Sequence, residues 1–188
     1  MKGLILQPLT AERWDDLESL FGPTGACGGC WCMCWRLPRK QFEKAKGEGN
    51  RQSLFRIVEQ GPPPGILAYL DGKPAAWCAV APRAEYPALE RSRVWKRVDE
   101  QPVWSISCFL VAKPYRSKGI TVALLRGAAE FARERGAAIV EGYPVEPAKG
   151  RMADVFVWTG LASAFRRAGF EEVARRSPTK PVMRLRVR

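Results

Sequence analysis

The sequence predicts one α/β (α+β) domain in which a mixed central sheet of about six to seven strands is flanked by about four helices. Strand-like and helix-like runs alternate along the 188 residues, which is typical of a sheet covered by helices. Apolar residues make up 46% of the chain, and a chain of this length buries roughly 70% of its unfolded surface. No internal repeat or linker divides residues 1–188, so a single domain is expected.

The first half is predicted to fold into strands and helices around a cysteine-rich segment. Thr10 is placed to cap the first helix, and Asp71-Gly72 between two apolar runs is a strong hairpin signal. Stretches rich in glycine and proline at 22–25 and 61–65 break the pattern. The expected elements are a strand over 3–9, a helix over 11–21, a helical region over 38–59 weakened by two glycines, and a hairpin over 66–70 and 74–81.

The second half alternates strands and helices more regularly. Residues 83–101 are polar and basic, and predict a short helix and a loop. Gly136 and Gly169 follow helical apolar patterns and are placed to end two helices. The expected elements are strands over 103–111 and 137–143, helices over 121–135 and 161–168, and strands over 170–175 and 182–187. Residues 183–188 alternate apolar with basic, which is typical of an edge strand with one solvated face.

The most informative local feature is the basic turn between the strand over 103–111 and the helix over 121–135. The turn consists of Arg116-Ser117-Lys118-Gly119-Ile120-Thr121. Free N–H groups and the positive end of the helix dipole attract anions at such a helix start, and Arg116 and Lys118 add full charges. The following strand over 137–143 completes a right-handed parallel unit, and ligands bind at the carboxyl ends of such strands. The turn therefore predicts a site for a phosphate-bearing ligand.

Charge and the absence of histidine limit the chemistry. The chain holds 31 Lys and Arg against 19 Asp and Glu, a net charge of +12, which favours anionic ligands such as nucleotides, CoA, nucleic acid or acidic substrates. Because the basic residues are scattered, a solvated surface is favoured over a nucleic-acid footprint. No histidine is present, which excludes Ser-His-Asp and Cys-His catalysis. Proton transfer must use Asp, Glu, Tyr, Cys, Lys or water.

Four of the six cysteines lie in the segment 27–35, which we call the cysteine-rich segment. The N-terminus is too short and too soon interrupted by Pro8 for a signal peptide, so a cytoplasmic protein with reduced thiols is expected. Structural zinc usually takes two well-separated ligand pairs. Ordinary thiols are therefore favoured over a metal site or a redox pair, and no metal is predicted. Trp31, Met33 and Trp35 share one side of the segment and either wall an apolar pocket or belong to the core. No apolar run is long enough for a membrane span.

The basic turn and its surroundings resemble the GNAT N-acetyltransferase superfamily. The family motif runs roughly Val-x-Pro-x-x-Arg/Gln-x-x-Gly-x-Gly/Ala. This chain offers Val111, Pro114, Arg116, Gly119 and Thr121, with one residue more between the first two. A later family pattern, Tyr-Glu-Lys-x-Gly-Phe, is matched by Phe-Arg-Arg-Ala-Gly-Phe at 165–170. The order of the elements is similar to that of the family over nearly the whole chain.

This resemblance implies acetyl-CoA as the donor cosubstrate. Its pyrophosphate would lie on the backbone N–H groups of residues 116–121, and its pantetheine arm would pair with the backbone of Phe109, Leu110 and Val111. The thioester would lie where the two parallel strands splay apart, with a strand N–H polarising the acyl carbonyl. A primary amine would enter from the other side, near the cysteine-rich segment, and attack directly in a ternary complex. A homodimer is a common assembly in the family.

Two positions depart from the family pattern. Thr121 replaces the second small residue of the motif, but its N–H stays usable and its hydroxyl offers a further phosphate contact. Phe165 stands where the family often has a tyrosine that protonates the leaving thiolate, and a phenyl ring cannot donate a proton. Phe165 is therefore expected only to line the cofactor site. Either another group donates that proton or the thiolate leaves unaided, since thiol pKa values lie near ~8.5.

Glu141 and Tyr143 are the candidate catalytic residues because they share one face of their predicted strand. Glu141 is the candidate base, directly or through water, and Tyr143 is the candidate replacement acid. The alternative is that both line a sheet end or face solvent. Cys108 is expected to be a buried thiol rather than an acyl-carrying nucleophile. Asp154 and Glu146, in the loop that follows, are weaker candidates.

Three functions follow from these observations. The leading one is an acetyl-CoA-dependent N-acetyltransferase. The alternative is a non-catalytic acyl-CoA-binding or sensing module, motivated by Phe165 and by the lack of an obvious base. A nucleic-acid-binding protein, motivated by the net charge alone, ranks last. The acceptor stays open among amino sugars, polyamines, antibiotics, small amines, protein N-termini and arylamines.

Overall fold

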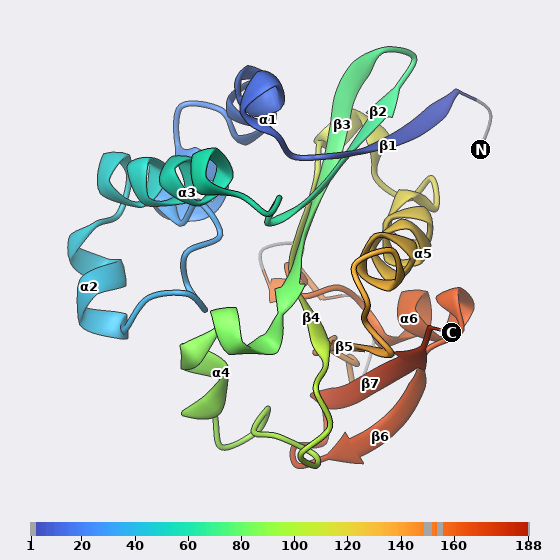
Figure 1. Cartoon of the computed structure of the whole chain (residues 1–188). Coiled ribbons are helices and arrows are strands. Elements are labelled where there is room, and N and C mark those ends of the chain that lie inside the picture. Colours follow the sequence, from blue (N-terminus) through green and yellow to red (C-terminus); the bar gives the residue numbers. More distant parts are fainter. Residues whose placement is uncertain (1–2, 149–151, 154–155, 188) are drawn as a thin grey trace.

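A seven-stranded mixed sheet runs through the centre of the protein in the computed structural model, which describes residues 3–148, 152–153 and 156–187 (Figure 1). The strand order is β1-β2-β3-β4-β5-β7-β6. Within the described residues, β4 and β5 are the parallel neighbours and the other strand pairs are antiparallel. The strands are β1 (Leu4–Pro8), β2 (Gly65–Leu70), β3 (Lys73–Pro82), β4 (Trp104–Val111), β5 (Ile139–Gly142), β6 (Glu171–Arg175) and β7 (Pro181–Arg186). The predicted mixed α/β sheet is confirmed.

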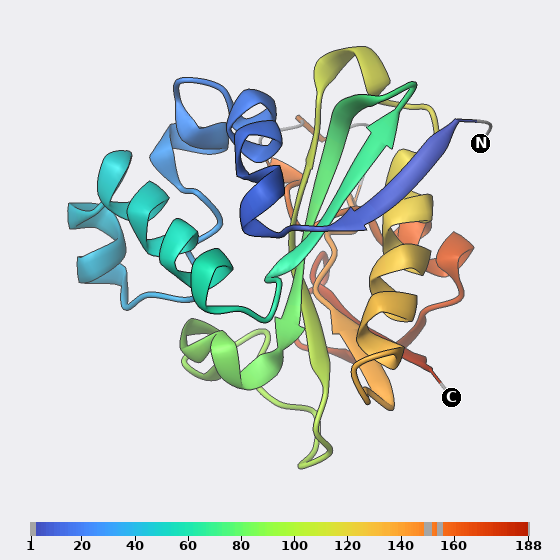
Figure 2. The ribbon, with the colours of Figure 1, turned by 45° about the horizontal axis from the view of Figure 1, so that its top comes forward.

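Helices cover both faces of this sheet. Figures 1 and 2 show α1, α2 and α3 on one side of β2–β4 and α5 and α6 on the other. The helices are α1 (Trp14–Phe21), α2 (Arg39–Lys44), α3 (Glu48–Gln60), α4 (Pro87–Glu90), α5 (Ile120–Arg133) and α6 (Ala162–Ala168). Four of them have seven or more residues in the described chain, beside the shorter α2 and α4. Over the same residues, no helix has the length and apolar character that a membrane crossing requires.

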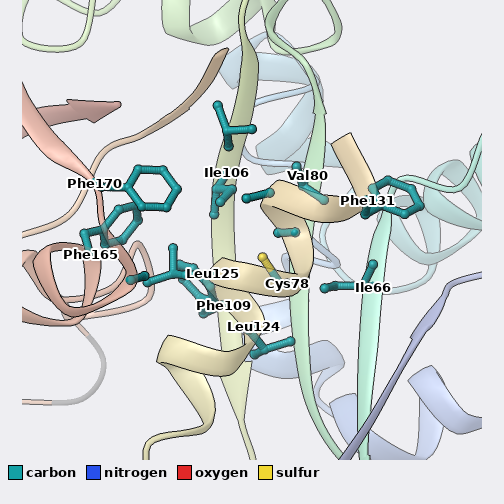
Figure 3. Packing of buried hydrophobic residues seen from close by; sticks show 14 of the residues in the cluster. Ile66, Cys78, Val80, Ile106, Phe109, Leu124, Leu125, Phe131, Phe165 and Phe170 are labelled. Carbon is teal, nitrogen blue, oxygen red and sulfur yellow. The ribbon is translucent and has the colours of Figure 1, made fainter. Parts of the chain in front are cut away.

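The larger core lies between the sheet and α5 (Figure 3). Leu124, Leu125 and Phe131 of α5 pack on apolar side chains from β2, β3 and β4. Gly127 brings the helix close to β1, since a Cβ there would lie 2.1 Å from Leu6 Cδ1. The amphipathic pattern predicted for this helix thus has the expected partner, and the packing fixes the start of α5 beside the end of β4.

Glycine positions predicted from the sequence match the structure. The β2–β3 hairpin turns at Asp71 and Gly72, both at positive φ (51° and 77°), as a type I′ turn requires. Gly136 ends α5 at φ 84°. Its N–H donates to Arg133 O and the Ala137 N–H donates to Ala132 O, each at 3.0 Å, which is the Schellman pattern. The sequence signals for these breaks are therefore confirmed.

The region over 38–59 is not one helix but two, α2 and α3. The chain breaks at Gly47, whose φ is 81°, and its N–H donates to Gly29 O at 3.0 Å. The same carbonyl accepts a bond from the buried side-chain amide of Asn50 at 3.1 Å. This break therefore anchors the cysteine-rich segment at Gly29, through a tertiary contact that the local sequence pattern does not reveal.

Two further expectations are wrong. The Thr10 side chain makes no capping bond, because its hydroxyl accepts a bond from Arg13 Nη1 at 3.0 Å and the helix begins with a 3₁₀ turn.

The strand predicted as an edge, β7, lies between β5 and β6, and β6 is the edge strand on this side of the sheet. Alternation of apolar and polar residues indicates how exposed each face of a strand is to solvent, but it does not indicate whether other strands pair with its edges. The inward face of β7 also carries Arg184, which is held by Glu141 and Asp99.

Candidate functional site

The basic turn forms a bed of backbone N–H groups at the start of α5. After β4 the chain makes a short 3₁₀ turn, and Ser117 (φ 60°) and Gly119 (φ 81°) then adopt left-handed conformations. Gly119 is the last residue before the helix. Across the described part of the chain, no group accepts a hydrogen bond from the N–H groups of residues 117–121. This is the arrangement that binds anions at a helix N-terminus.

Two cations sit on this turn in different ways. Arg116 Nε donates to Val111 O at 3.0 Å, which ties the turn to the end of β4. Lys118 is exposed, and its Nζ lies 5.8 Å from the centroid of the Tyr115 ring. A Cβ at Gly119 would meet no atom within 4 Å. The glycine is therefore required by its backbone conformation, and the space above the turn is open.

Beyond Ile106, the β5 side of β4 pairs with no strand of the described chain, and we call this side its free edge. The parallel pairing ends at Ile106, opposite Gly142. The pairing of β4 with β3 also shifts between Ala79 and Val80, so that Ser107 has no partner in register. A bulge of this kind bends a strand and increases its twist. The splayed strands predicted for the thioester are thus present at this point.

Backbone direction decides which groups of β4 face this edge. The Ala112 N–H donates to a β3 carbonyl, whereas the Phe109 N–H points the other way and donates to Trp158 O at 2.7 Å. Since successive residues of a strand face opposite sides, Val111 shares the free edge with Phe109, and Leu110 faces β3. The contact from Trp158 had no sequence signal, because it comes from a loop with no periodic pattern.

Phe165 lies beneath the separation of β4 and β5. It is fully buried and packs edge-on against Phe109 (6.1 Å) and Phe170 (5.0 Å) (Figure 3). A Cβ at Gly142 would lie 2.2 Å from the Phe165 ring, and one at Gly160 would lie 2.9 Å from it. The ring therefore forms the floor under the end of β5, and its contact with a cofactor stays a prediction.

Glu141 and Tyr143 lie together in a buried polar network. The Tyr143 hydroxyl donates to Glu141 Oε1 at 2.7 Å and accepts a bond from Arg83 Nη1 at 2.6 Å. The Ser105 hydroxyl lies 2.7 Å from the hydroxyl oxygen of Tyr143. Glu141 also binds Arg83 Nη1 at 3.0 Å and Arg184 Nε at 2.7 Å. A phenol has one donor and two acceptor sites, so Tyr143 is fully bonded in this arrangement.

The network continues on both sides. Arg83 donates to Glu90 Oε1 (2.9 Å) and to Trp95 O (2.8 Å), while Arg184 binds both oxygens of Asp99 (2.7 and 3.1 Å). The hydrogen bonds from Arg184 lower the pKa of Asp99 to about 2. These side chains lie far from Glu141 in sequence, so the sharing of one strand face predicted its proximity to Tyr143 but not the arginines.

Burial and hydrogen bonding within this network bear on the acid–base chemistry of Glu141 and Tyr143. Both side chains are 1% exposed, and burial raises the pKa of the Tyr143 phenol well above its usual value. Two guanidinium groups, those of Arg83 and Arg184, hold the Glu141 carboxylate in place. The roles of Glu141 and Tyr143 as base and acid stay predictions. Glu146 is ion-paired with Arg166 and Arg175, and Asp154 lies outside the described residues.

The cysteines are all free thiols, and the segment that holds four of them packs against the sheet. Trp77 Nε1 donates to Cys32 Sγ at 3.2 Å. The neighbouring Cys108 thiol and burial raise the pKa of Cys32. Cys108 is buried on β4, where the sequence places it. In the described ranges no three Cys, Asp or Glu side chains are arranged to hold a metal ion.

The two tryptophans of the cysteine-rich segment have different surroundings. Trp31 is core, since it packs on Trp14 (5.9 Å) and on Phe21 (5.2 Å). Trp35 instead stacks on Trp158 (5.8 Å), whose carbonyl contacts β4 at Phe109, and it meets Trp95 edge-on (5.3 Å). Trp31 therefore follows the predicted core alternative, and a pocket wall at Trp35 stays a prediction. The three-tryptophan cluster could not be predicted, because its members come from three distant loops.

Comparisons with known proteins agree with this geometry. The family model described as "Acetyltransferase (GNAT) family" matches residues 31–148, more than half of the chain. No curated protein sequence matches.

Solved structures share the fold at low identity. A GNAT-family acetyltransferase from Streptococcus agalactiae is 11% identical with a TM-score of 0.58, covering 100% of this chain and 96% of its own. The PaiA N-acetyltransferase from Thermoplasma acidophilum, in complex with coenzyme A, is 13% identical (TM-score 0.54, 97% and 98% covered). A GCN5-related N-acetyltransferase from Kribbella flavida is 18% identical (TM-score 0.50), and the match covers 90% of this chain but 33% of that longer one. With the family model, the mixed sheet and the turn before α5 in agreement, the chain belongs to the GNAT acetyltransferase family.

Proposed function

We propose that this protein is an acetyl-CoA-dependent N-acetyltransferase in which a primary amine attacks the thioester directly. The observation that carries this proposal is the bed of N–H groups at residues 117–121, at the carboxyl end of β4 and the N-terminus of α5. Phosphate oxygens satisfy such groups, and Arg116 and Lys118 supply the countercharge. The residues that hold the pyrophosphate in this proposal are Arg116, Ser117, Lys118, Gly119, Ile120 and Thr121.

The free edge of β4 holds the acyl group in this proposal. When bound, acetyl-CoA supplies an activated thioester, and the protein holds it in line with the amine. The Val111 backbone lies on the free edge and can pair with the pantetheine arm, while Leu110 stabilises the strand from the β3 side. The Phe109 N–H polarises the acyl carbonyl only after the Trp158 carbonyl withdraws from it. Proximity of two reactants is worth about 7–11 kcal/mol in favourable cases.

Glu141 and Tyr143 act in this proposal mainly by holding the carboxyl end of β5 in place. Tyr143 follows Gly142, where β5 and β4 separate, and its hydroxyl fixes that point to Arg83 and Ser105. The buried ion pairs support this positioning role. A direct part as base or acid remains their predicted alternative, and the pH dependence of kcat in Tyr143→Phe distinguishes the two.

A non-catalytic acyl-CoA sensor is the second candidate. It is favoured by the full bonding of Tyr143 and by the absence of a hydroxyl at Phe165. A sensor binds acetyl-CoA and releases no CoA with any amine, whereas an enzyme releases CoA at a rate that depends on the amine concentration.

The donor site is tested by calorimetric titration of CoA and acetyl-CoA into the wild type and Gly119→Glu. We expect micromolar binding to the wild type. The new carboxylate would lie in the open space over the turn and repel the phosphates, which should weaken binding about 100-fold or more.

Gly136→Glu is the matched control for this titration. Gly136 ends the same helix at φ 84°, again with open space around its Cβ. The backbone strain is thus similar in both variants, and only Gly119→Glu should lose binding. Equal binding by the two variants would place the phosphates elsewhere, and no binding by the wild type would refute the donor.

A further inference from the structure

Buried polar atoms without partners gather at the splayed end of β4. In the described residues, the buried side-chain atoms with no hydrogen bond include two indole nitrogens and two hydroxyl oxygens from this region. They are Trp35 Nε1, Trp95 Nε1, Ser107 Oγ and Thr159 Oγ1. Leaving such groups unpaired is unfavourable. The two indole nitrogens in particular call for an acceptor that the described residues do not supply.

Contacts between rings join Trp35, Trp95, Tyr143 and Trp158 into one surface, which we call the wall. The Ser107 hydroxyl lies beside the Tyr86 side chain, which belongs to the same buried cluster as Trp95 and Tyr143. The Tyr143 ring lies 5.9 Å from that of Trp95. Trp95 meets Trp35, and Trp35 stacks on Trp158.

The wall begins at the reacting edge and ends at the surface. The Trp158 carbonyl accepts the Phe109 N–H, so the wall touches the β4 edge where the thioester is proposed. Trp35 and Trp158 are only partly buried. A small molecule that approaches over these two rings therefore arrives next to the acyl group.

The charges around the wall favour an anion over a cation. Arg36 is paired with Glu85, and Arg83 is paired with Glu90 and Glu141. Lys180 lies with its Nζ 5.4 Å from the Trp95 ring centroid and has no ion pair with any residue that the structure describes. The surplus charge beside the indoles is thus positive.

We propose that the acceptor is an amino-acid-like amine, whose carboxylate is bound by the indole N–H groups of Trp35 and Trp95 and by the Ser107 hydroxyl. An indole N–H is a donor only, so its partner must present an acceptor oxygen. A carboxylate accepts several such bonds and pairs with Lys180, while the indole faces receive an apolar side chain. This inference rests on the proposed acetyltransferase function and names the substrate class of the same site.

Two amines that differ only in a carboxylate test the proposal. Phenylalanine and 2-phenylethylamine are compared as acceptors with acetyl-CoA, and CoA release is measured, with spermidine as a polycationic reference. We expect kcat/KM for phenylalanine to exceed that for 2-phenylethylamine by about tenfold or more, because bonds to a charged group are the stronger ones. Spermidine should be poorer still. Equal or reversed preference would overturn the proposal.

Variants separate recognition from structural damage. Trp35→Phe and Trp95→Phe keep a ring and remove the N–H, and Ser107→Ala removes the hydroxyl. Each should raise KM for phenylalanine about tenfold and leave KM for acetyl-CoA and for 2-phenylethylamine unchanged. Trp31→Phe, whose ring packs on Trp14 and Phe21, is the control and should change KM for neither amine. Equal losses for both amines would mean a structural role only.

Binding of phenylalanine, measured by calorimetry in the presence of CoA and in its absence, distinguishes this proposal from the proposed function. Phenylalanine binding that is weakened by Trp35→Phe supports the carboxylate site even if no acetyl transfer occurs. If CoA binds and amines are acetylated but phenylalanine binding is not affected by the three variants, the transferase stands and this inference fails.

Discussion

Some residues of this site could be predicted from their local sequence, whereas others depend on contacts with distant parts of the chain. The conformations of Gly119 and Gly136 could be predicted from the sequence, because a glycine at a helix end has a local cause. The environment of Glu141 could not, since Arg83 and Arg184 are separated from it by 58 and 43 positions. Trp35 Nε1 and Ser107 Oγ were missed for the same reason, as an unpaired atom is visible only when all its neighbours are known.

At the residue scale, Tyr143→Phe should destabilise the protein without changing how kcat depends on pH. The hydroxyl makes three buried bonds, and its loss leaves Arg83 and Ser105 short of a partner. We expect the free energy of unfolding to fall by about 1–3 kcal/mol, measured by urea denaturation.

Tyr69→Phe is the control for that change. The Tyr69 hydroxyl makes one bond, to Asp16 at 2.6 Å, between β2 and α1. Its loss should cost less, about 1 kcal/mol. If Tyr143→Phe instead abolishes one limb of the pH profile of kcat while stability is retained, Tyr143 is the acid and the positioning role is wrong.

At the element scale, the sequence predicted the β4–α5–β5 unit and its glycine breaks because periodicity and turn chemistry are local. It did not predict the place of β7, because strand order depends on pairing between distant segments. The sequence pattern predicted one helical region in place of α2 and α3, because the hydrogen bond from Gly47 to Gly29 has no local sequence signal. The Trp158 contact to β4 belongs to the same class of tertiary feature.

The packing of β5 on α6 gives a prediction at this scale. A methyl group at Gly142 would lie 2.2 Å from the Phe165 ring, so Gly142→Ala should lower the free energy of unfolding by about 1–3 kcal/mol. Phe165→Leu shortens the side chain and should make room for the methyl group. A double-mutant cycle by urea denaturation should therefore show the pair to be less destabilised than the sum, by about 0.5–3 kcal/mol. Additive losses would mean that the methyl group meets another neighbour.

At the scale of the whole molecule, charge and composition explain what fold alone does not. The net charge of +12 predicted an anionic ligand in general terms, and the structure places two of these cations on the turn before α5. Several other arginines are in ion pairs with acidic residues, which is why the net charge alone does not indicate a nucleic-acid surface. Because no histidine is present, the pH dependence of stability must come from groups that titrate outside the neutral range.

Stability should therefore be level through neutral pH and fall on both sides. Hydrogen bonds from Arg184, Arg166 and Arg175 lower the pKa values of Asp99, Glu146 and Glu172. A carboxyl whose folded pKa lies below its unfolded value stabilises the protein above about pH 4, and this is lost as the pH falls through the folded pKa.

On the alkaline side, burial raises the pKa values of Tyr143 and Cys78. Their contribution is complete below the unfolded values, about 8.5 for a thiol and about 10 for a phenol, and it is lost as the pH rises past them. Thermal melting from pH 2 to 11 should thus show a plateau between about pH 5 and 8. Asp99→Asn should reduce the acid limb and leave the alkaline limb intact, because it removes one carboxyl and no phenol or thiol. A marked step in melting temperature near pH 6.5 would contradict the assignment, since these groups do not titrate there.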